Sequence, residues 1–225
     1  MKAADLYDPD SRLLDGGYAN VEPIAYDDPK IAYVVARARG KRVLDLGCVM
    51  HDPNEYRSRY FLHRAIREVA EETLGLDLHE QGVEALNALG FQAIVGDAEH
   101  FALDRQFDTI VAGDLIEHLG NVEGFLKSVM GCLAPGGKLV IQTPNPWYWK
   151  NSAKAVLNEE VPNNPEHTCW FDPRTLRQLA ARFGLELTAV EFQSRSRKDR
   201  WLPLPRGLRH TSWSAELVRS GSDGK

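Results

Sequence analysis

Four aspartates stand where short apolar runs of the chain end, and their spacing could support ligand binding. Asp45 lies in VLDLGC, Asp77 in LGLDL, Asp97 after AIVG and Asp114 after TIVAG. A carboxylate accepts hydrogen bonds from hydroxyl and amino groups and attracts cations. If the runs are parallel strands, their carboxyl ends share the sheet edge at which open α/β sheets bind ligands. We therefore expect Asp45, Asp77 and Asp97 to face one site, with Asp114 bounding it or facing a second ligand.

Histidine is the side chain best suited to accepting a proton near neutral pH. His118, in DLIEHL, and His167, in NPEHTCWF, compete for the role of a base, and an orienting or structural role is the alternative for each. His51 could contact a carboxylate of the ligand. Glu117 is expected to be a charge at a helix N-terminus. Ordinary surface or helix positions are expected for the other histidines, His63, His79, His100 and His210.

The elements that must position these residues alternate along the chain. Apolar runs predict strands at 42–46, 74–78, 91–95, 107–112, 137–143, 185–192 and 211–218. Helical spacing and caps predict helices at 29–39, 56–73, 80–89, 122–133 and 173–183. This order predicts an α/β fold, a Rossmann-like and mostly parallel seven-stranded sheet with helices on both faces. The last two strands are expected to form an antiparallel hairpin at one edge, so that the last strand is reversed.

The expected organisation is one domain at 41–220, with a lead-in and cap helix at 1–40 and a disordered tail at 221–225. The stretch 145–168 has several prolines and no clear periodicity, which is typical of a functional loop, and we expect a lid over the substrate. Aromatic residues near it could form a wall for an apolar, aromatic or sugar-containing ligand, or else a minor core. They are Trp147, Tyr148, Trp149, Trp170 and Phe171, with Tyr18, Tyr26 and Tyr33 as further candidates.

Composition and charge limit the partners and the cellular location that we expect for this protein. The chain has 225 residues, 43% hydrophobic and 26% charged, with a net charge of -5. The acidic balance makes nucleic acid an improbable partner, and the basic segment 194–210 is expected to be a solvated loop away from the ligand. No apolar run is long enough for a membrane span, and the N-terminus has no signal-peptide core, so a cytoplasmic location is expected. The three cysteines have no metal-ligand spacing, and no acidic cluster predicts a metal.

Five stretches, in order, resemble the motifs of class I S-adenosylmethionine-dependent methyltransferases. They are VLDLGC, GLDLHEQGVEAL, VGDAEHF, FDTIVAGDLIEHL and LAPGGKLVIQTPN. The resemblance covers about residues 30 to 218 and implies the cofactor S-adenosyl-L-methionine. By this resemblance, the methionine end of the cofactor would contact Asp45, Gly47, Cys48 and His51, and the ribose would contact Asp77. The adenine would contact Leu78, Asp97 and Ala98, and the transferable methyl would lie near Asp114 and Leu115.

One motif departs from the family's pattern. The first motif usually reads G-x-G, but here Gly47 is followed by Cys48 and Val49. Asp77 follows Gly47 by 30 residues, whereas the dinucleotide-binding fingerprint has about 20. We therefore expect a different path of the loop over the cofactor. Together with the acidic composition and the aromatic loop, the resemblance predicts methyl transfer to a hydroxyl oxygen of a small-molecule or glycan acceptor. An RNA methyltransferase and a non-catalytic cofactor-binding or scaffold domain are the alternatives, and the oligomeric state stays open.

Overall fold

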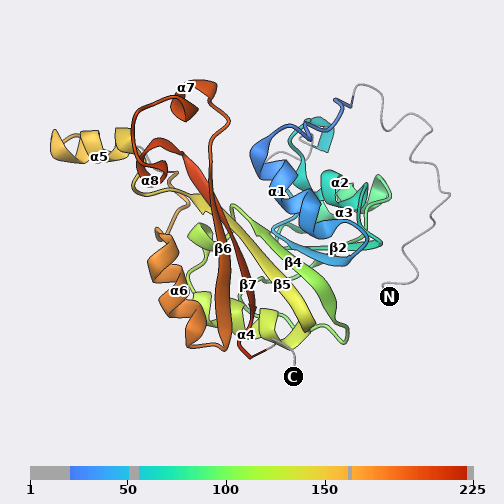
Figure 1. Ribbon diagram of the computed structural model, residues 1–225. Coiled ribbons are helices and arrows are strands. Elements are labelled where there is room, and N and C mark those ends of the chain that lie inside the picture. Colours follow the sequence, from blue (N-terminus) through green and yellow to red (C-terminus); the bar gives the residue numbers. More distant parts are fainter. Residues whose placement is uncertain (1–20, 51–55, 162–163, 222–225) are drawn as a thin grey trace.

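The computed structural model describes residues 21–50, 56–161 and 164–221. The predictions for His51, for Tyr18 and for nearly all of the expected tail lie outside the described residues. The described chain forms a seven-stranded sheet with helices on both faces (Figure 1). The predicted fold class is confirmed.

The strand order is β3-β2-β1-β4-β5-β7-β6. The strands are β1 (Arg42–Leu46), β2 (Glu72–Asp77), β3 (Ala93–Val95), β4 (Phe107–Gly113), β5 (Leu133–Pro144), β6 (Leu185–Gln193) and β7 (Ser212–Arg219). The first five pair in parallel, whereas β7 runs antiparallel between β5 and β6. The order reverses at β1 and β4, so that their carboxyl ends flank a switch point, where such sheets bind ligands.

The helices form a layer on each face of the sheet (Figure 1). They are α1 (Pro29–Ala38), α2 (Leu62–Arg67), α3 (Glu80–Ala88), α4 (Val122–Cys132), α5 (Trp149–Val156), α6 (Pro173–Ala181), α7 (Arg197–Arg200) and α8 (Arg206–Arg209), with a short 3-10 helix, η3 (Ile116–His118). Helices α1 and α2 pack on one face, and α4 and α6 pack on the other. This arrangement leaves the carboxyl ends of the strands open between the two layers.

Side-chain alternation in the strands explains the two layers. Val43 of β1 packs with α1 and α2, whereas Leu44 and Leu46 belong to the larger core below α4 and α6. Successive residues of a strand point to opposite faces, so a strand buried on both sides must be apolar throughout. Asp45 shares the parity of Val43, and it therefore points toward α2.

Helix α1 begins where the sequence predicted. The Asp28 side chain accepts hydrogen bonds from the backbone N–H groups of Lys30 and Ile31, and proline occupies the first turn. An N-cap of this kind stabilises a helix by about 1 kcal/mol. The helix is also tied to the sheet, because Arg37 Nη2 lies 3.0 Å from Glu216 Oε1 on β7.

The predicted helix 56–73 is wrong in length. Helix α2 spans only Leu62–Arg67, and β2 begins at Glu72 rather than at residue 74. The chain leaves the helix early because the backbone after it pairs with the turn before β1: Gly40 N–H donates to the Val69 carbonyl at 2.9 Å. Strand β3 is likewise shorter than predicted and starts at residue 93.

The stretch 145–168 is not irregular throughout, because α5 lies inside it. Helix α5 has no buried residue. It has only eight residues, which is shorter than the window over which apolar spacing predicts a helix. Figure 1 shows α5 beyond the end of the sheet, beside α8.

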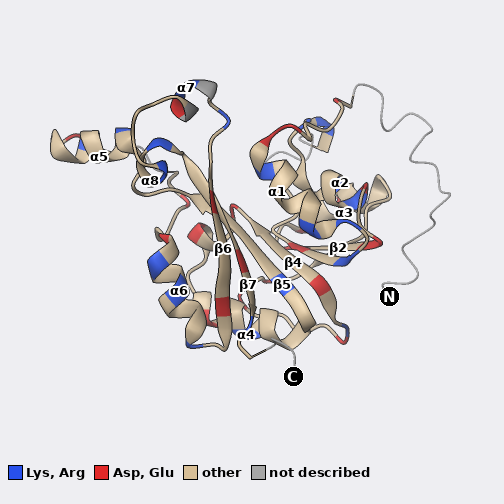
Figure 2. Cartoon of the chain, in the orientation of Figure 1, with Lys and Arg blue, Asp and Glu red and all other residues tan. Residues whose placement is uncertain are grey.

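Among the described residues, no helix is both long and apolar enough to cross a membrane. Acidic and basic residues are spread over helices and strands alike rather than gathered on one element (Figure 2).

Candidate active site

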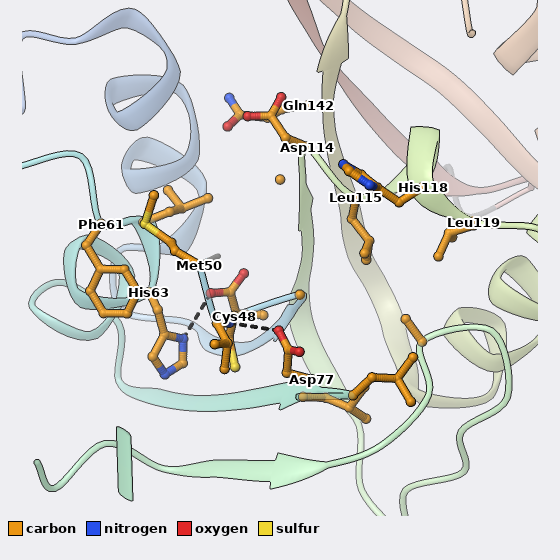
Figure 3. Close-up of a pocket in the computed structure, with 18 of the residues that line it drawn as sticks. Cys48, Met50, Phe61, His63, Asp77, Asp114, Leu115, His118, Leu119 and Gln142 are labelled. Carbon is orange, nitrogen blue, oxygen red and sulfur yellow. Dashed lines mark hydrogen bonds and ion pairs between the residues drawn. The ribbon is translucent and has the colours of Figure 1, made fainter. Parts of the chain in front are cut away.

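A cavity of about 620 Å³ lies along the carboxyl ends of the strands. Figure 3 shows Cys48 and Asp77 at one end of it and Asp114 and His118 at the other. Every described residue that the sequence assigned to a cofactor lines this cavity: Asp45, Gly47, Cys48, Asp77, Leu78, Asp97, Ala98, Asp114 and Leu115. The tertiary structure therefore brings together the carboxylates that the sequence placed at separate strand ends.

Asp45 is buried and bonded to a histidine that the sequence analysis had set aside. His63 Nδ1 lies 2.9 Å from Asp45 Oδ2, and both side chains are almost inaccessible to solvent. His63 does lie in a helix, as one of the two expected positions, but α2 presents it to β1 instead of to water. Burial raises the pKa of Asp45, against the opposing effect of His63.

Asp77 orders the two loops beside it. Its Oδ2 accepts a hydrogen bond from Val49 N–H at 2.8 Å, and its Oδ1 accepts one from His79 N–H at 2.9 Å. Each carboxylate oxygen has a second lone pair, which leaves acceptor capacity toward the cavity. Asp97 has a comparable local bond, from Glu99 N–H to Oδ1 at 2.8 Å.

The incomplete glycine motif has a structural counterpart. Gly47 has φ of 73°, a conformation in which a side chain is strained, and a Cβ there would lie 3.1 Å from Leu115 Cδ1. Val49 stands where the family's second glycine is expected, and it packs over Gly82 of α3, where a Cβ would lie 2.3 Å from Val49 Cγ1. Room for the larger residue is thus provided by a glycine on the neighbouring helix.

Two cations that sequence reasoning missed stand at the open end of the cavity. Lys30 of α1 pairs with Asp114, and this ammonium lowers the pKa of Asp114 although burial acts to raise it. Arg195 Nε donates to Asp28 Oδ2 at 2.7 Å, and its guanidinium lies 4.2 Å from the centre of the Tyr60 ring. The basic segment was expected to lie away from the ligand. That prediction is wrong for Arg195, because the segment follows β6 and passes over the N-terminus of α1.

A second cavity of about 440 Å³ shares Lys30, Asp114, His118 and Arg195 with the first. His118 lines both cavities, whereas His167 lines only the second. The two imidazole rings pack edge to face with their centres 4.7 Å apart. Burial, and next the neighbouring His118, lower the pKa of His167. The two histidines proposed as alternatives therefore form one pair beside the first cavity.

Glu117 is buried, which the sequence analysis did not foresee. It lies in the first turn of η3, at a helix N-terminus as expected, but it is only 1% exposed. Its Oε2 accepts from the Thr143 hydroxyl at 2.9 Å, while its Oε1 has no hydrogen-bond partner among the described residues. Burial, and next the charge of Asp114, raise the pKa of Glu117 to about 7. No local pattern in LIEHL reveals this burial, since Glu117 stands between Ile116 and His118.

The predicted aromatic wall is wrong for these two cavities. None of the side chains Trp147, Tyr148, Trp149, Trp170 and Phe171 lines either one, and neither does Tyr26 or Tyr33. Tyr33 lies in the core below α1, and the Tyr148 hydroxyl donates to Asp199 Oδ1 at 3.1 Å. The aromatic side chains at the first cavity are instead Tyr60 and Phe61.

Residues 25–190 match the methyltransferase domain family. This chain belongs to the class I S-adenosylmethionine-dependent methyltransferase family. It is 30% identical over 154 residues to a ubiquinone biosynthesis O-methyltransferase of Aeromonas salmonicida, a match that covers 65% of this chain and 63% of that protein. The chain thus spans less than two thirds of the length of this relative.

Solved structures share the fold. A TehB-like S-adenosylmethionine-dependent methyltransferase from Corynebacterium glutamicum has a TM-score of 0.57 at 20% identity, with 86% of this chain and 88% of that chain covered. The glycopeptide N-methyltransferase MtfA, solved with S-adenosyl-L-methionine, has a TM-score of 0.56 at 20% identity, with the same coverages of 86% and 88%. At this identity the likeness concerns the fold alone.

Proposed function

We propose that this protein transfers the methyl group of S-adenosyl-L-methionine to a hydroxyl oxygen of a small-molecule or glycan acceptor. The observation that carries the proposal is the single cavity in which Asp45, Asp77 and Asp97 meet, joined to a second cavity through His118. The first volume suits a ligand of the size of this cofactor. The name of the Aeromonas salmonicida relative supports oxygen as the methylated atom.

The residues of the first cavity fit the cofactor in order. Asp77, at the end of β2, would accept hydrogen bonds from the ribose hydroxyls. Asp97 and the backbone of Ala98 would bind the adenine edge, with Leu78, 68% exposed, beneath its face. Asp45 and Gly47 would face the methionine end, where the glycine lets the backbone approach closely. When bound, S-adenosylmethionine supplies a methyl group on a positively charged sulfur.

The second cavity would bind the acceptor. Besides the paired histidines, its lining is polar and includes Asn164, Ser194, Ser196, Thr211 and Ser212. Such groups suit an acceptor that carries hydroxyls. His118 and His167 would activate the hydroxyl that attacks, because imidazole is the group best matched to proton transfer near neutral pH. Since Asn164 and His167 belong to the stretch 145–168, we propose that this segment is the substrate lid.

The cofactor assignment is tested by calorimetry with S-adenosylhomocysteine. Asp77→Ala removes both proposed ribose contacts, and hydrogen bonds to a charged group contribute about 1.5–3 kcal/mol each, so affinity should fall about tenfold or more. Asp104→Ala, which removes an exposed aspartate outside both cavities, is the matched control and should bind like the wild type. Failure of the wild-type protein to bind would refute the cofactor claim.

Acceptor chemistry is tested with the same preparation and a panel of hydroxyl-bearing small molecules and glycans. Formation of S-adenosylhomocysteine would exclude a purely cofactor-binding or scaffold domain. Turnover with mixed tRNA alone, falling steeply with salt, would instead establish an RNA methyltransferase.

We also propose a cytoplasmic location, which fractionation of expressing cells would test.

A further inference from the structure

Three side chains that could bind a metal ion meet at the second cavity. Glu117, His118 and His167 each place a possible ligand atom within 4.8 Å of those of the other two. Helix η3 supplies the first two residues. The third is held by the backbone that follows it, because Thr168 N–H donates to the Glu117 carbonyl at 2.8 Å. The cluster is therefore positioned by two segments that are bonded to each other.

The carboxylate of this cluster has no cation bonded to it among the described residues. The nearby ammonium of Lys30 pairs with Asp114 instead. Glu117 is 1% exposed, and its Oε1 has no hydrogen-bond partner in the described part of the chain. Burying a carboxylate is costly unless it is paired, bonded or bound to a metal. A buried oxygen of this kind next to two imidazoles is an independent indication of a ligand.

The donor set indicates the kind of ligand. Two imidazole nitrogens with one carboxylate oxygen suit first-row divalent metal ions, and three protein ligands leave a position open for substrate. All three residues line the second cavity, so the open position would face the acceptor. We propose that Glu117, His118 and His167 bind a divalent transition-metal ion that in turn binds the acceptor hydroxyl. The role toward the acceptor rests on the proposed function, whereas the metal site itself does not.

In this site the two histidines would hold the metal ion, and the ion would activate the hydroxyl instead of an imidazole base. A hydroxyl bound to a divalent ion is more acidic, so its proton can pass to water. The oxygen then attacks the methyl carbon and forms the new O–C bond. The C–S bond breaks, and its electron pair stays on sulfur, which yields S-adenosylhomocysteine. Lys30 and Asp114 line both cavities, so they would lie near the reacting groups.

A second group of possible ligands provides a control. Asp97, Glu99 and His100 also lie within reach of a common ion. Here, however, Glu99 Oε1 accepts from Gly120 N–H at 2.6 Å and from Asn121 N–H at 3.0 Å. The side chain of His100 is 65% exposed. A buried carboxylate oxygen without a hydrogen-bond partner is found only in the first cluster, as far as the chain is described.

The test measures metal directly. The full chain is stripped with a chelator, dialysed separately against Zn²⁺, Co²⁺ and Mg²⁺, and analysed by mass spectrometry for bound metal. We expect about one Zn²⁺ or Co²⁺ per chain, a visible absorption band with Co²⁺, and weaker binding of Mg²⁺. Glu117→Gln and His167→Ala should each weaken Zn²⁺ binding at least tenfold, whereas His100→Ala should bind like the wild type.

Circular dichroism and S-adenosylhomocysteine calorimetry on each variant establish that it is folded and retains its cofactor cavity. Equal Zn²⁺ binding by wild type, Glu117→Gln and His167→Ala would overturn the site, as would loss of binding in His100→Ala alone. Unchanged turnover after metal removal would overturn the role toward the acceptor. Failure of the proposed function would appear separately, as absent cofactor binding in the same wild-type preparation.

Discussion

The packing of Val49 against Gly82 allows a sharp test of how this chain accommodates its incomplete glycine motif. A Cβ on Gly82 would lie 2.3 Å from Val49 Cγ1 and 2.7 Å from His79 Nδ1. Valine is stiff about χ1, so its methyl groups cannot easily rotate away. Gly82→Ala should therefore displace the loop, while Val49→Gly, which restores the family's glycine, should remove the closest contact.

The expected magnitude follows from two opposing effects. Alanine is more favourable than glycine in a helix by about 1 kcal/mol, and forcing an extra carbon into a packed site costs about 1–3 kcal/mol. In the wild-type background, Gly82→Ala should lower the free energy of unfolding by about 0–2 kcal/mol. In the Val49→Gly background the same change should cost less, because only the close contact with His79 Nδ1 at 2.7 Å remains. The coupling energy between the two sites should then be about 1–2 kcal/mol.

Urea denaturation of the wild type, both single variants and the double variant measures this coupling. Gly131→Ala on α4, where a Cβ would meet nothing within 4 Å, is the control and should raise stability. Calorimetry with S-adenosylhomocysteine should show weaker binding in Gly82→Ala, because Val49 N–H bonds to Asp77. A coupling energy below about 0.3 kcal/mol would mean that the two sites are independent, which would refute the packing argument.

Three further variants probe other contacts. Glu216→Gln should lower stability at pH 7 by about 1–3 kcal/mol. Although burial acts to raise the pKa of Glu216, its two cations hold the pKa below the usual value. The stabilisation is therefore present above the unfolded-state pKa, and it should vanish when urea titrations are repeated at pH values falling through the folded-state pKa. A variant that differs equally from wild type at every pH would contradict this. Gly47→Ala should lose about 1 kcal/mol of stability from its positive φ and bind S-adenosylhomocysteine more weakly by calorimetry; unchanged affinity would show that the cavity tolerates a Cβ there. Arg195→Ala leaves the buried Asp28 carboxylate without its guanidinium and should cost about 1–3 kcal/mol in thermal or urea unfolding, whereas wild-type stability would mean that water replaces the contact.

The family and the position of the first cavity were accessible from the sequence. Apolar runs separated by helical spacing predict parallel strands, and the carboxyl ends of such strands must lie at one edge of the sheet. Asp45, Asp77, Asp97 and Asp114 follow that rule, and all four line one cavity. Local order fixes these positions because each aspartate is near the end of its own strand.

The partners of the polar side chains were decided only by the tertiary structure. The contact of His63 with Asp45, of Val49 with Gly82, and of His167 with His118 each joins separate elements of the chain. Helix α2 was predicted too long, which concealed its histidine, and Glu117 resembled a surface charge because no local pattern reveals that a loop covers it. Periodicity reports which side of an element faces the core, but it does not report which distant segment lies against that side. For this reason the sequence determined the strand-end carboxylates, while folding alone decided that a buried glutamate and two histidines line the second cavity.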